Sequence, residues 1–504
     1  MHPSLILKTG LLAVGALLAA LPGHAQAADP PRCVYTAVAN LPLKYMGPAL
    51  GVTMEGSING KPAPLLVNTA TPRHFLTRTG AERHGLRLRN SDSTLLGISG
   101  YSRVYSARID EFSVGPASTR RLDLPVIGDQ SAPPPWDGMV GASYLLQADL
   151  ELSYAEKRIR MFRPTNCDDQ FLAYWDRKTV EIPFEESASP GVNPRFGVVL
   201  NGVALTAVID SSATSSMVSL EAARRIGLKL DAPNVERIGD AAGIGQARSA
   251  RWSAVFDSLR IGTETISSPR LDVVDAGRLQ VDVLLGADFL RSHRVLFAMS
   301  QSRLYFSYVG GDALSQRRAI EPWVEQEAGE GNVDAQMALA GAYLRQRGEA
   351  GQKQGQVWLE RAASNGNPQA NALIGQRLVQ LGRPAEASYR LRKAVDAQPN
   401  ARRAALWLYA ARMLNKQGEL GRKELEKNFE REDDWPEPVA RFYLGKLSEA
   451  ELIKEARLDD KSARDNLCLA RIHIALRHGW EGDTARAASA RAQQRQDCGA
   501  GGAP

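Results

Sequence analysis

The sequence predicts two similar all-β lobes in tandem, followed by an all-α helical array. Three observations support this fold class. A motif around residue 68 recurs around residue 210, the motifs that follow it recur in the same order, and a helical pattern with a 35-residue period replaces the strand pattern after residue 309. The chain has 504 residues, of which 44% are hydrophobic and 23% charged, as is typical of a folded protein with several domains.

The first 27 residues predict a signal peptide that is removed on export. Lys8 precedes an apolar run from Gly10 to Leu21, and Ala25-Gln26-Ala27 provides the small residues that signal peptidase requires. An uncleaved membrane anchor is the alternative, but the run is too short to span a bilayer comfortably. We therefore expect an exported protein of the bacterial periplasm, with no integral membrane segment after cleavage.

The charge pattern argues against nucleic acid as a partner. The 62 Lys and Arg side chains are nearly balanced by 56 Asp and Glu, the formal net charge is +6, and no region concentrates positive charge. The sequence also lacks a CxxC pair, an HExxH motif and a Gly-Lys-Ser/Thr phosphate loop, and its seven histidines are scattered. We therefore expect no metal and no cofactor.

Four cysteines in an exported chain suggest disulfide bonds, for which three connectivities exist. Cys33 and Cys167 bracket one domain-sized segment, and Cys468 and Cys498 bracket a helical hairpin near the end of the chain. The economical expectation is that each cysteine pairs with its bracket partner. Free thiols and the other pairings are the alternatives.

The internal repeat begins with an apolar strand pattern that ends in a polar loop. Leu65–Thr71 is matched by Ala207–Ala213, an offset of 142 residues. Further matched pairs follow in the same order: the helix-like runs Ala81–Leu86 and Ala222–Leu228, the glycine hairpins Gly97–Gly100 and Gly243–Gln246, and the hydrophobic-Gly-Ala motifs Val140–Leu145 and Leu285–Leu290. The last pair is offset by 145 residues, so insertions are few. Short alternating strands with turn residues between them make both copies mostly β.

This order of motifs resembles the retropepsin-like aspartic peptidases, in the tandem-lobe form found in exported bacterial proteins. The resemblance covers about residues 34–309 and implies one lobe at 34–167 and a second at 178–309, in the acid protease fold. It also implies that the hairpins at Gly97–Gly100 and Gly243–Gly245 are flaps over a cleft; ordinary glycine hairpins are the alternative.

Peptide hydrolysis in this family uses two carboxylates, one from each lobe, which share one proton and divide the roles of acid and base. In lobe two, Asp210 occupies the acid position and is the candidate acid/base, with Ser211 in the hydroxyl position. In lobe one, Asn68 occupies the acid position and Thr69 the hydroxyl position. A neutral amide cannot share a proton with a carboxylate, so within one chain the catalytic pair is half missing.

Both loops also lack the glycine that the family has after the hydroxyl residue, since Ala70 and Ser212 replace it. Outside such a repeat, a loop aspartate such as Asp210 most often caps its own turn. Asp288 is expected to hydrogen-bond locally rather than to act as a second acid, because its counterpart in lobe one is Ser143.

A helical array is predicted for residues 319–498, after a linker at Gly310–Gln316. Gly331-Asn332-Val333-Asp334-Ala335 recurs as Gly366-Asn367-Pro368-Gln369-Ala370, a spacing of 35 residues. This segment resembles tetratricopeptide and Sel-type repeats, which form solenoids whose concave face binds peptides or proteins. Further helices are expected at residues 401–416, 420–431, 467–477 and 484–494.

Three functions remain open at this point, and whether the chain is an enzyme is uncertain. The first is a catalytically impaired relative of the aspartic peptidases that binds a peptide or protein in its β cleft, on its helical repeats, or on both. The second is an active aspartic endopeptidase, a protein hydrolase that uses Asp210 from two chains of a dimer or an unrecognised second acid. The third is a scaffold whose helical repeats alone carry the function. The missing first acid favours the first.

Overall fold

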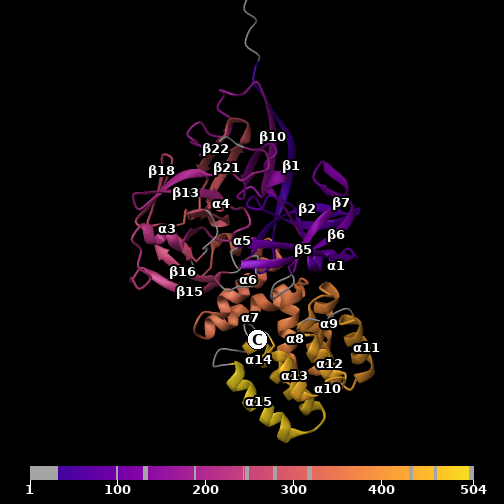
Figure 1. Ribbon diagram of the computed structural model, residues 1–504. Helices are drawn as coiled ribbons and strands as arrows, with labels where there is room; N and C mark the ends of the chain where they lie inside the picture. Colours follow the sequence, from indigo (N-terminus) through magenta and orange to yellow (C-terminus); the bar gives the residue numbers. More distant parts are fainter. Residues whose placement is uncertain are drawn as a thin grey trace, which may run out of the picture.

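Figure 1 shows the computed structural model of the chain. The structure describes residues 32–97, 100–128, 134–186, 189–241, 243, 249–275, 281–314, 320–430, 435–458 and 463–498. The predicted signal peptide and part of the predicted linker lie outside the described residues.

The predicted fold class is confirmed: a β-rich half with two sheets precedes a helical half (Figure 1). The first lobe contains β1 (Val34–Met46), β2 (Gly51–Ile58), β3 (Lys61–Val67), β4 (Phe75–Thr77), α1 (Arg78–Arg83), β5 (Leu88–Gly97), β6 (Gly100–Val114), β7 (Ala117–Ile127), β8 (Gly138–Val140), α2 (Ala142–Leu145), β9 (Asp149–Ser153) and β10 (Arg158–Thr165). The second lobe contains β11 (Val180–Pro183), β12 (Phe196–Leu200), β13 (Val203–Ile209), β14 (Met217–Ser219), α3 (Leu220–Arg225), β15 (Val235–Ala241), β16 (Ser249–Val255), β17 (Ser258–Ile261), β18 (Glu264–Ser267), β19 (Arg270–Val274), β20 (Val283–Leu285), α4 (Ala287–Ser292), β21 (His293–Ala298), the 3₁₀ turn η1 (Met299–Gln301) and β22 (Arg303–Tyr308).

The two lobes share one continuous sheet. Its strand order is β11-β22-β21-β9-β10-β1-β2-β3-β8-β4-β7-β6-β5, so strands from lobe two extend the sheet of lobe one. The junction is the antiparallel pair β9–β21, in which Leu150 lies opposite Phe297 and Leu152 opposite Val295. All four side chains are fully buried. Lobe two has its own sheet in the order β15-β16-β19-β14-β20-β13-β12-β17-β18.

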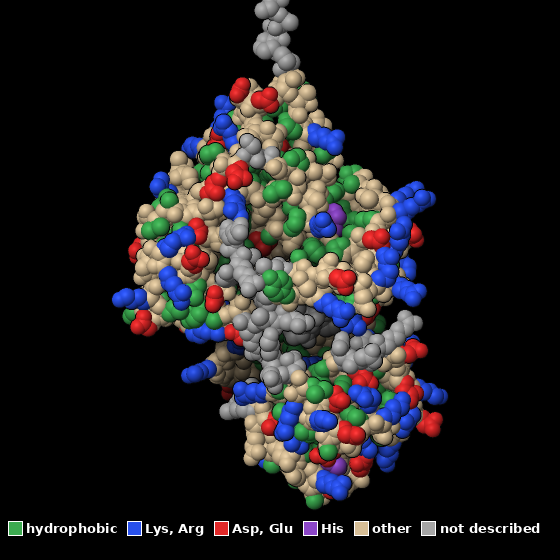
Figure 2. All heavy atoms as spheres, viewed as in Figure 1, with side chains coloured by type: hydrophobic (Ala, Val, Ile, Leu, Met, Phe, Trp, Pro, Cys, Tyr) green, Lys and Arg blue, Asp and Glu red, His purple; other side chains and the backbone are tan. Residues whose placement is uncertain are grey.

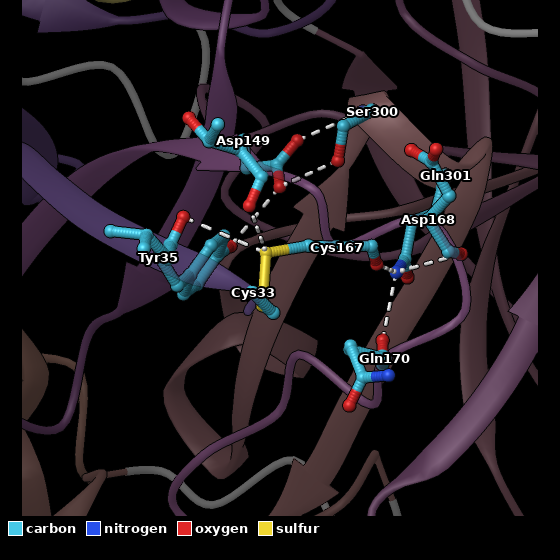
Figure 3. Close-up of a disulfide and its surroundings, with 10 residues drawn as sticks. Cys33, Tyr35, Asp149, Cys167, Asp168, Gln170, Ser300 and Gln301 are labelled. Atoms are coloured by element: carbon cyan, nitrogen blue, oxygen red, sulfur yellow. Dashed lines mark hydrogen bonds between the residues drawn. A yellow bond between two sulfur atoms is a disulfide. The ribbon is translucent and has the colours of Figure 1, made fainter. Parts of the chain in front are cut away.

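The Cys33–Cys167 disulfide ties the start of β1 to the chain that follows β10 (Figure 3). Beside it, Gln301 from lobe two donates a hydrogen bond of 2.6 Å to the carbonyl oxygen of Cys167, and Asp149 accepts bonds from both the backbone and the hydroxyl of Ser300. Cys468 and Cys498 form the second disulfide, between the last two helices. The predicted pairing of all four cysteines is confirmed, and disulfides of this kind indicate an oxidising compartment.

The helical half consists of α5 (Pro322–Gly329), α6 (Val333–Leu344), α7 (Glu349–Ser364), α8 (Pro368–Gln380), α9 (Pro384–Ala397), α10 (Arg402–Leu414), α11 (Gly418–Asn428), α12 (Glu437–Tyr443), α13 (Glu449–Ala456), α14 (Ala463–Trp480) and α15 (Thr484–Cys498). The helices expected from the sequence correspond to α10, α11, α14 and α15. Within the described residues, none of the helices is both long enough and apolar enough to cross a membrane.

The 35-residue repeat in the sequence is a repeat of asparagine caps. Asn367 caps α8 and also donates a hydrogen bond of 2.9 Å back to Asp334, in the first turn of α6. One repeat earlier, Asn332 caps α6, but its amide donates to the carbonyl oxygen of Tyr45 at the end of β1. Asp334 in turn accepts a bond of 2.7 Å from the backbone nitrogen of Gly47. The turn after β1 therefore makes with α6 the contacts that a preceding helical repeat would make.

Aromatic and charged side chains complete this junction. Trp323 at the start of α5 packs against Tyr45, with ring centroids 5.0 Å apart. The guanidinium of Arg291 lies over the Trp323 ring, 4.2 Å from its centroid. Lys157 forms an ion pair with Glu327 of α5, which is 7% exposed. Such partly buried contacts fix α5 on the lobes more firmly than a flexible linker would.

The first two helices share their core with the β lobes. Ala328, Ala335 and Leu339 are buried in the same hydrophobic cluster as the lobe residues, whereas α7–α15 pack around a second cluster that also includes Ala340 of α6. A second contact lies farther along the array, where Asn400 donates a hydrogen bond of 2.7 Å to Glu82 of α1. The helical array is thus docked on lobe one at two places.

We predict that Asp334→Ala lowers the free energy of unfolding by about 1–3 kcal/mol, because the Gly47 N–H loses its acceptor and the Asn367 amide loses the shorter of its two hydrogen bonds. The matched control is Asp396→Ala, which removes an exposed carboxylate paired only along α9 and should cost no more than about 0.5 kcal/mol. Urea denaturation of the full chain measures both values. Equal stability of the two variants would mean that this junction contributes nothing.

Candidate functional site

The two loops that carry Asn68 and Asp210 begin at equivalent places in the lobes. Each follows a strand that pairs in parallel with a second strand, β3 with β8 in lobe one and β13 with β20 in lobe two. The Asn68 nitrogen donates to the carbonyl oxygen of Val140 at 3.0 Å, and the Asp210 nitrogen donates to that of Leu285 at 2.9 Å. The backbone therefore places both side chains in the same position relative to the parallel strand pair of their lobe.

Crossed hydrogen bonds join the two loops. The Thr69 hydroxyl donates to the carbonyl oxygen of Ile209 at 2.7 Å and accepts from the backbone nitrogen of Ser211 at 3.1 Å. The Ser211 hydroxyl makes the mirror-image pair, donating to the carbonyl oxygen of Val67 at 2.9 Å and accepting from the Thr69 nitrogen at 3.0 Å. Both hydroxyl residues are buried, so these four bonds satisfy backbone groups that water cannot reach.

Glycines behind the loops allow this close packing. A Cβ atom on Gly141 would lie 2.4 Å from the carbonyl oxygen of Arg73, and one on Gly286 would lie 2.8 Å from that of Ser215. Neither separation is possible without a shift of the backbone. Gly141 and Gly286, in the hydrophobic-Gly-Ala motifs, therefore allow the loops of Asn68 and Asp210 to lie against the backbone at the start of α2 and α4.

In lobe one, the Asn68 side chain is buried and engaged by its own loop. Its Oδ1 accepts hydrogen bonds from the backbone nitrogens of Ala70 at 2.9 Å and Thr71 at 2.8 Å. Its Nδ2 faces the sulfur of Met139 at 3.8 Å. An amide in this setting offers neither a negative charge nor a titratable proton.

In lobe two, Asp210 has a similar setting but carries a carboxylate. Its Oδ1 accepts hydrogen bonds from the Ser212 nitrogen at 2.9 Å and from the Ser212 hydroxyl at 2.7 Å. Burial raises the pKa of Asp210, and the hydrogen bonds from Ser212 and Ala213 oppose that rise. The residue that replaces the family glycine therefore binds the carboxylate directly.

Three residues near the loops were not predicted from the sequence. Tyr154 donates from its hydroxyl to the carbonyl oxygen of Ser211 at 2.8 Å, and Asn193 donates to that of Ile209 at 3.1 Å. His74 accepts from the nitrogen of Gly141, and burial lowers its pKa, which favours the neutral ring. None of the three lies in one of the repeated motifs of the sequence.

The hydrogen-bond partners of Asp288 differ from the local ones predicted from the sequence. It does accept a bond from the adjacent Phe289 nitrogen, but its main partner is Ser216, whose hydroxyl donates at 2.6 Å and whose nitrogen donates at 2.8 Å. Ser216 also accepts a bond from Gly286. Asp288 therefore braces the loop that follows Asp210 rather than bonding only locally.

The predicted flaps fall partly outside the described residues. Strands β5 and β6 pair as a hairpin up to Gly97 and Gly100, and β15 and β16 pair up to Ala241 and Ser249. The tips themselves, residues 98–99, 242 and 244–248, lie outside the described residues. The part of the chain that the structure describes contains no cluster of three or more side chains suited to a metal ion.

We predict that Thr69→Val lowers the free energy of unfolding by about 1–3 kcal/mol, because the buried Ser211 N–H loses its acceptor. Thr69→Ser is the matched control, since it keeps the hydroxyl and removes only a methyl group, at a cost of about 1 kcal/mol. Chemical denaturation compares the two. Equal losses would show that the crossed bonds do not stabilise the fold.

We predict that Asp210→Asn leaves the protein at least as stable as the wild type at pH 7. A carboxyl with a raised native pKa binds its proton more tightly when folded, so its contribution to stability is full below the unfolded pKa and is lost as the pH rises through the native pKa. Asparagine lacks this loss, and Asn68 already makes equivalent loop bonds. Denaturation from pH 3 to pH 8 should show a gap between the variants that widens with pH. A variant less stable than wild type at pH 7 would contradict the argument.

Comparison with known proteins places both loops in matched segments. Residues 54–144 and 196–289 each match the family model described as aspartyl protease. Solved structures similar to the chain include an aspartic proteinase from Irpex lacteus, at 12% identity over 56% of this chain and 100% of that chain with a TM-score of 0.34. They also include conglutin gamma, a basic 7S globulin from lupine seeds, at 12% identity over 54% of this chain and 94% of that chain with a TM-score of 0.31. The basic 7S globulin from soybean is similar at 13% identity over 53% of this chain and 96% of that chain, with a TM-score of 0.30.

These identities and TM-scores are too low to assign an activity to this chain. No curated protein matches it. The family match is tandem, with one copy in each lobe and one loop in each copy. The β half of the chain is therefore a tandem pair of aspartyl-protease-like lobes, followed by a helical region that the family model does not include.

Proposed function

We propose that this protein is an exported relative of the aspartic peptidases that has lost catalysis and binds peptide or protein partners. The observation that carries this proposal is the setting of Asn68. It occupies the frame that matches that of Asp210, and its oxygen is engaged by two backbone nitrogens of its own loop.

The chemistry requires two carboxylates that share one proton, with one acting as base on a water molecule and the other as acid. Asn68 supplies no acid or base, and its nitrogen faces a methionine sulfur rather than a carboxylate. Asp210 is left as a single half-buried carboxyl whose Oδ1 accepts hydrogen bonds from Ser212. Loss of one member of an acid–base pair costs on the order of a hundred- to ten-thousand-fold in rate.

Two sheet ends support binding of an extended peptide. The continuous sheet ends at β5 and the sheet of lobe two ends at β15, and each of these strands belongs to a hairpin that the family resemblance assigns as a flap. An edge strand has unpaired backbone groups, so an extended peptide can add to it as a further strand. The partner would then be held by its backbone, which needs no catalytic residue.

The helical half supports a second partner surface. Its two asparagine caps lie 35 residues apart, and neighbouring helices pack on one another in pairs, α6 with α7, α8 with α9, α10 with α11 and α14 with α15, which supports a tetratricopeptide-type solenoid. Figure 2 shows basic and acidic side chains interspersed over the visible face of this half, without a patch of one sign. Such a surface favours a peptide or protein partner over nucleic acid.

The two disulfides and the N-terminal sequence support export. Cys33–Cys167 and Cys468–Cys498 require an oxidising compartment to form and persist. With the signal-peptide pattern of residues 1–27, the bacterial periplasm is the compartment that fits best.

We predict that the purified wild-type monomer cleaves peptides no faster than Asp210→Asn at acidic pH, with or without pepstatin. Asn68→Asp should create a coupled pair of carboxyls, one of which titrates well above the reference value of about 3.9. Activity should appear most clearly when Ala70→Gly and Ser212→Gly are added, because both side chains stand where the family has glycine.

Two outcomes would contradict the proposal. The first is pepstatin-sensitive cleavage by the wild-type monomer that Asp210→Asn abolishes. The second is a folded triple variant without coupled titration, since its two carboxyls would then not be neighbours. Cleavage that appears only at concentrations where the chain dimerises would instead support an active enzyme that uses Asp210 from two chains.

A further inference from the structure

Tyr154, directly after β9 of lobe one, contacts the loop that carries Asp210 in lobe two. Its side chain is 2% exposed, and its hydroxyl donates to the carbonyl oxygen of Ser211 at 2.8 Å. Burial raises the pKa of Tyr154, so the hydroxyl stays protonated and acts as the donor. Within the described residues, no other group donates a hydrogen bond to this carbonyl oxygen. The buried Ser211 carbonyl therefore depends on Tyr154 for its hydrogen bond.

The peptide unit that contains this carbonyl also contains the N–H of Ser212. The unit is planar and trans, so its C=O and N–H bonds point in opposite directions and fixing one fixes the other. The Ser212 N–H donates to Oδ1 of Asp210 at 2.9 Å, and the Ser212 hydroxyl donates to the same oxygen at 2.7 Å. The peptide unit thus lies between the Tyr154 hydroxyl and the Asp210 carboxylate and is hydrogen-bonded to both.

The two hydrogen bonds of this peptide unit strengthen each other. A donor to the Ser211 carbonyl polarises the unit and makes the Ser212 N–H a better donor. The hydrogen bonds from Ser212 favour the charged carboxylate and so oppose the rise in the pKa of Asp210 that burial causes. Loss of the Tyr154 hydroxyl would leave the peptide unit free to rotate and would weaken the bonds that favour the charged form.

The loop of Asn68 differs at the corresponding position. The 145-residue offset at the end of the internal repeat aligns Tyr154 with Met299, and the strand registers of β9 with β10 and of β21 with β22 give the same alignment. A thioether has no hydrogen to donate to a carbonyl oxygen. The hydroxyl therefore accompanies the loop with the carboxylate, and the loop with the neutral amide has no counterpart at this position.

Tyr154 is itself connected to the helical half. Its backbone carbonyl oxygen accepts a hydrogen bond from the hydroxyl of Tyr45 at 3.4 Å, and the Tyr45 ring packs against Trp323 of α5. The charged and titratable groups that act on Tyr154 are Tyr45, Asp210 and Arg291 of α4. The contacts that support the Asp210 loop therefore begin at α5 and pass through β1.

We propose that Tyr154 is a positioning residue of the Asp210 site, which holds the Ser211–Ser212 peptide so that its N–H points at the carboxylate. In this role Tyr154 touches no ligand, but it determines how Asp210 is presented to one and over which pH range Asp210 is charged. The proposal goes beyond the proposed function and does not rest on it, because it holds equally for a site that binds peptides and for one that cleaves them.

The test is NMR of the full chain with ¹³C-labelled aspartate and ¹⁵N-labelled serine, in which Asp210→Asn and Ser212→Ala identify the two signals. Tyr154→Phe should make the Asp210 carboxyl titrate at a higher pH than in the wild type, because the bonds that favour its charged form are weakened. Exchange of the Ser212 amide hydrogen with solvent should become about tenfold faster, as expected for the loss of one hydrogen bond.

Tyr144→Phe is the matched control. The buried Tyr144 hydroxyl also donates to a backbone carbonyl oxygen, that of Val114, at 2.9 Å. Its removal should cost a similar amount of stability and leave the signals of Asp210 and Ser212 as they are in the wild type. An Asp210 titration that Tyr154→Phe does not move, or that Tyr144→Phe moves equally, would overturn the proposal.

A measurement on the wild type keeps the proposal testable if Tyr154→Phe does not fold. The Ser212 amide proton and the Asp210 carboxyl should shift with one common midpoint, since they form one hydrogen bond. An amide proton that does not follow the carboxyl would overturn the proposal. None of these outcomes depends on peptide binding or cleavage, so failure here is distinguishable from failure of the proposed function.

Discussion

The crossed hydrogen bonds of Thr69 and Ser211 are the interaction on which the β half depends. They tie loops 142 residues apart and bury four hydrogen bonds at the junction of the lobes. Each hydroxyl serves as donor and acceptor at once, which only Ser, Thr or Tyr can do. The requirement falls on positions 69 and 211, and it is independent of what stands at positions 68 and 210. The fold can therefore keep its symmetry with Asn68 in one loop and Asp210 in the other.

The hydrogen bonds within each loop explain why an amide is accommodated at position 68. Asn68 and Asp210 each accept bonds from backbone nitrogens of their own loops, so an amide oxygen replaces a carboxylate oxygen without leaving a donor unpaired. Two buried carboxylates side by side raise each other's pKa and destabilise the folded state at neutral pH. Replacing one with asparagine removes that cost. An amide has no titratable proton, so stability and acid–base chemistry favour different residues at such a position.

The sequence predicted what local pattern and repetition encode. The tandem lobes, the loop positions, the disulfide pairs and the helices α10, α11, α14 and α15 follow from the internal repeat, the placement of the cysteines and local periodicity. Contacts between distant segments were not predictable in this way. The hydrogen bonds from Tyr154 to Ser211 and from Ser216 to Asp288 join residues that are far apart in the sequence, and no local pattern indicates them. The docking of α5 and α6 on β1 was likewise not predicted, because the strand pattern of β1 and the helical patterns of α5 and α6 can each be recognised without any sign of the contact between them.

The turn after β1 has a consequence for how the two halves can diverge. It binds α6 through the carbonyl oxygen of Tyr45 and the nitrogen of Gly47, so lobe one contributes main-chain atoms and the helical array contributes the side chains Asn332 and Asp334. Most side-chain substitutions in the turn leave those atoms in place, whereas one inserted or deleted residue displaces both. An inserted residue in this turn would therefore displace α6 from lobe one and set it against the other contacts that hold the array, those of Trp323 with Tyr45, Lys157 with Glu327 and Asn400 with Glu82.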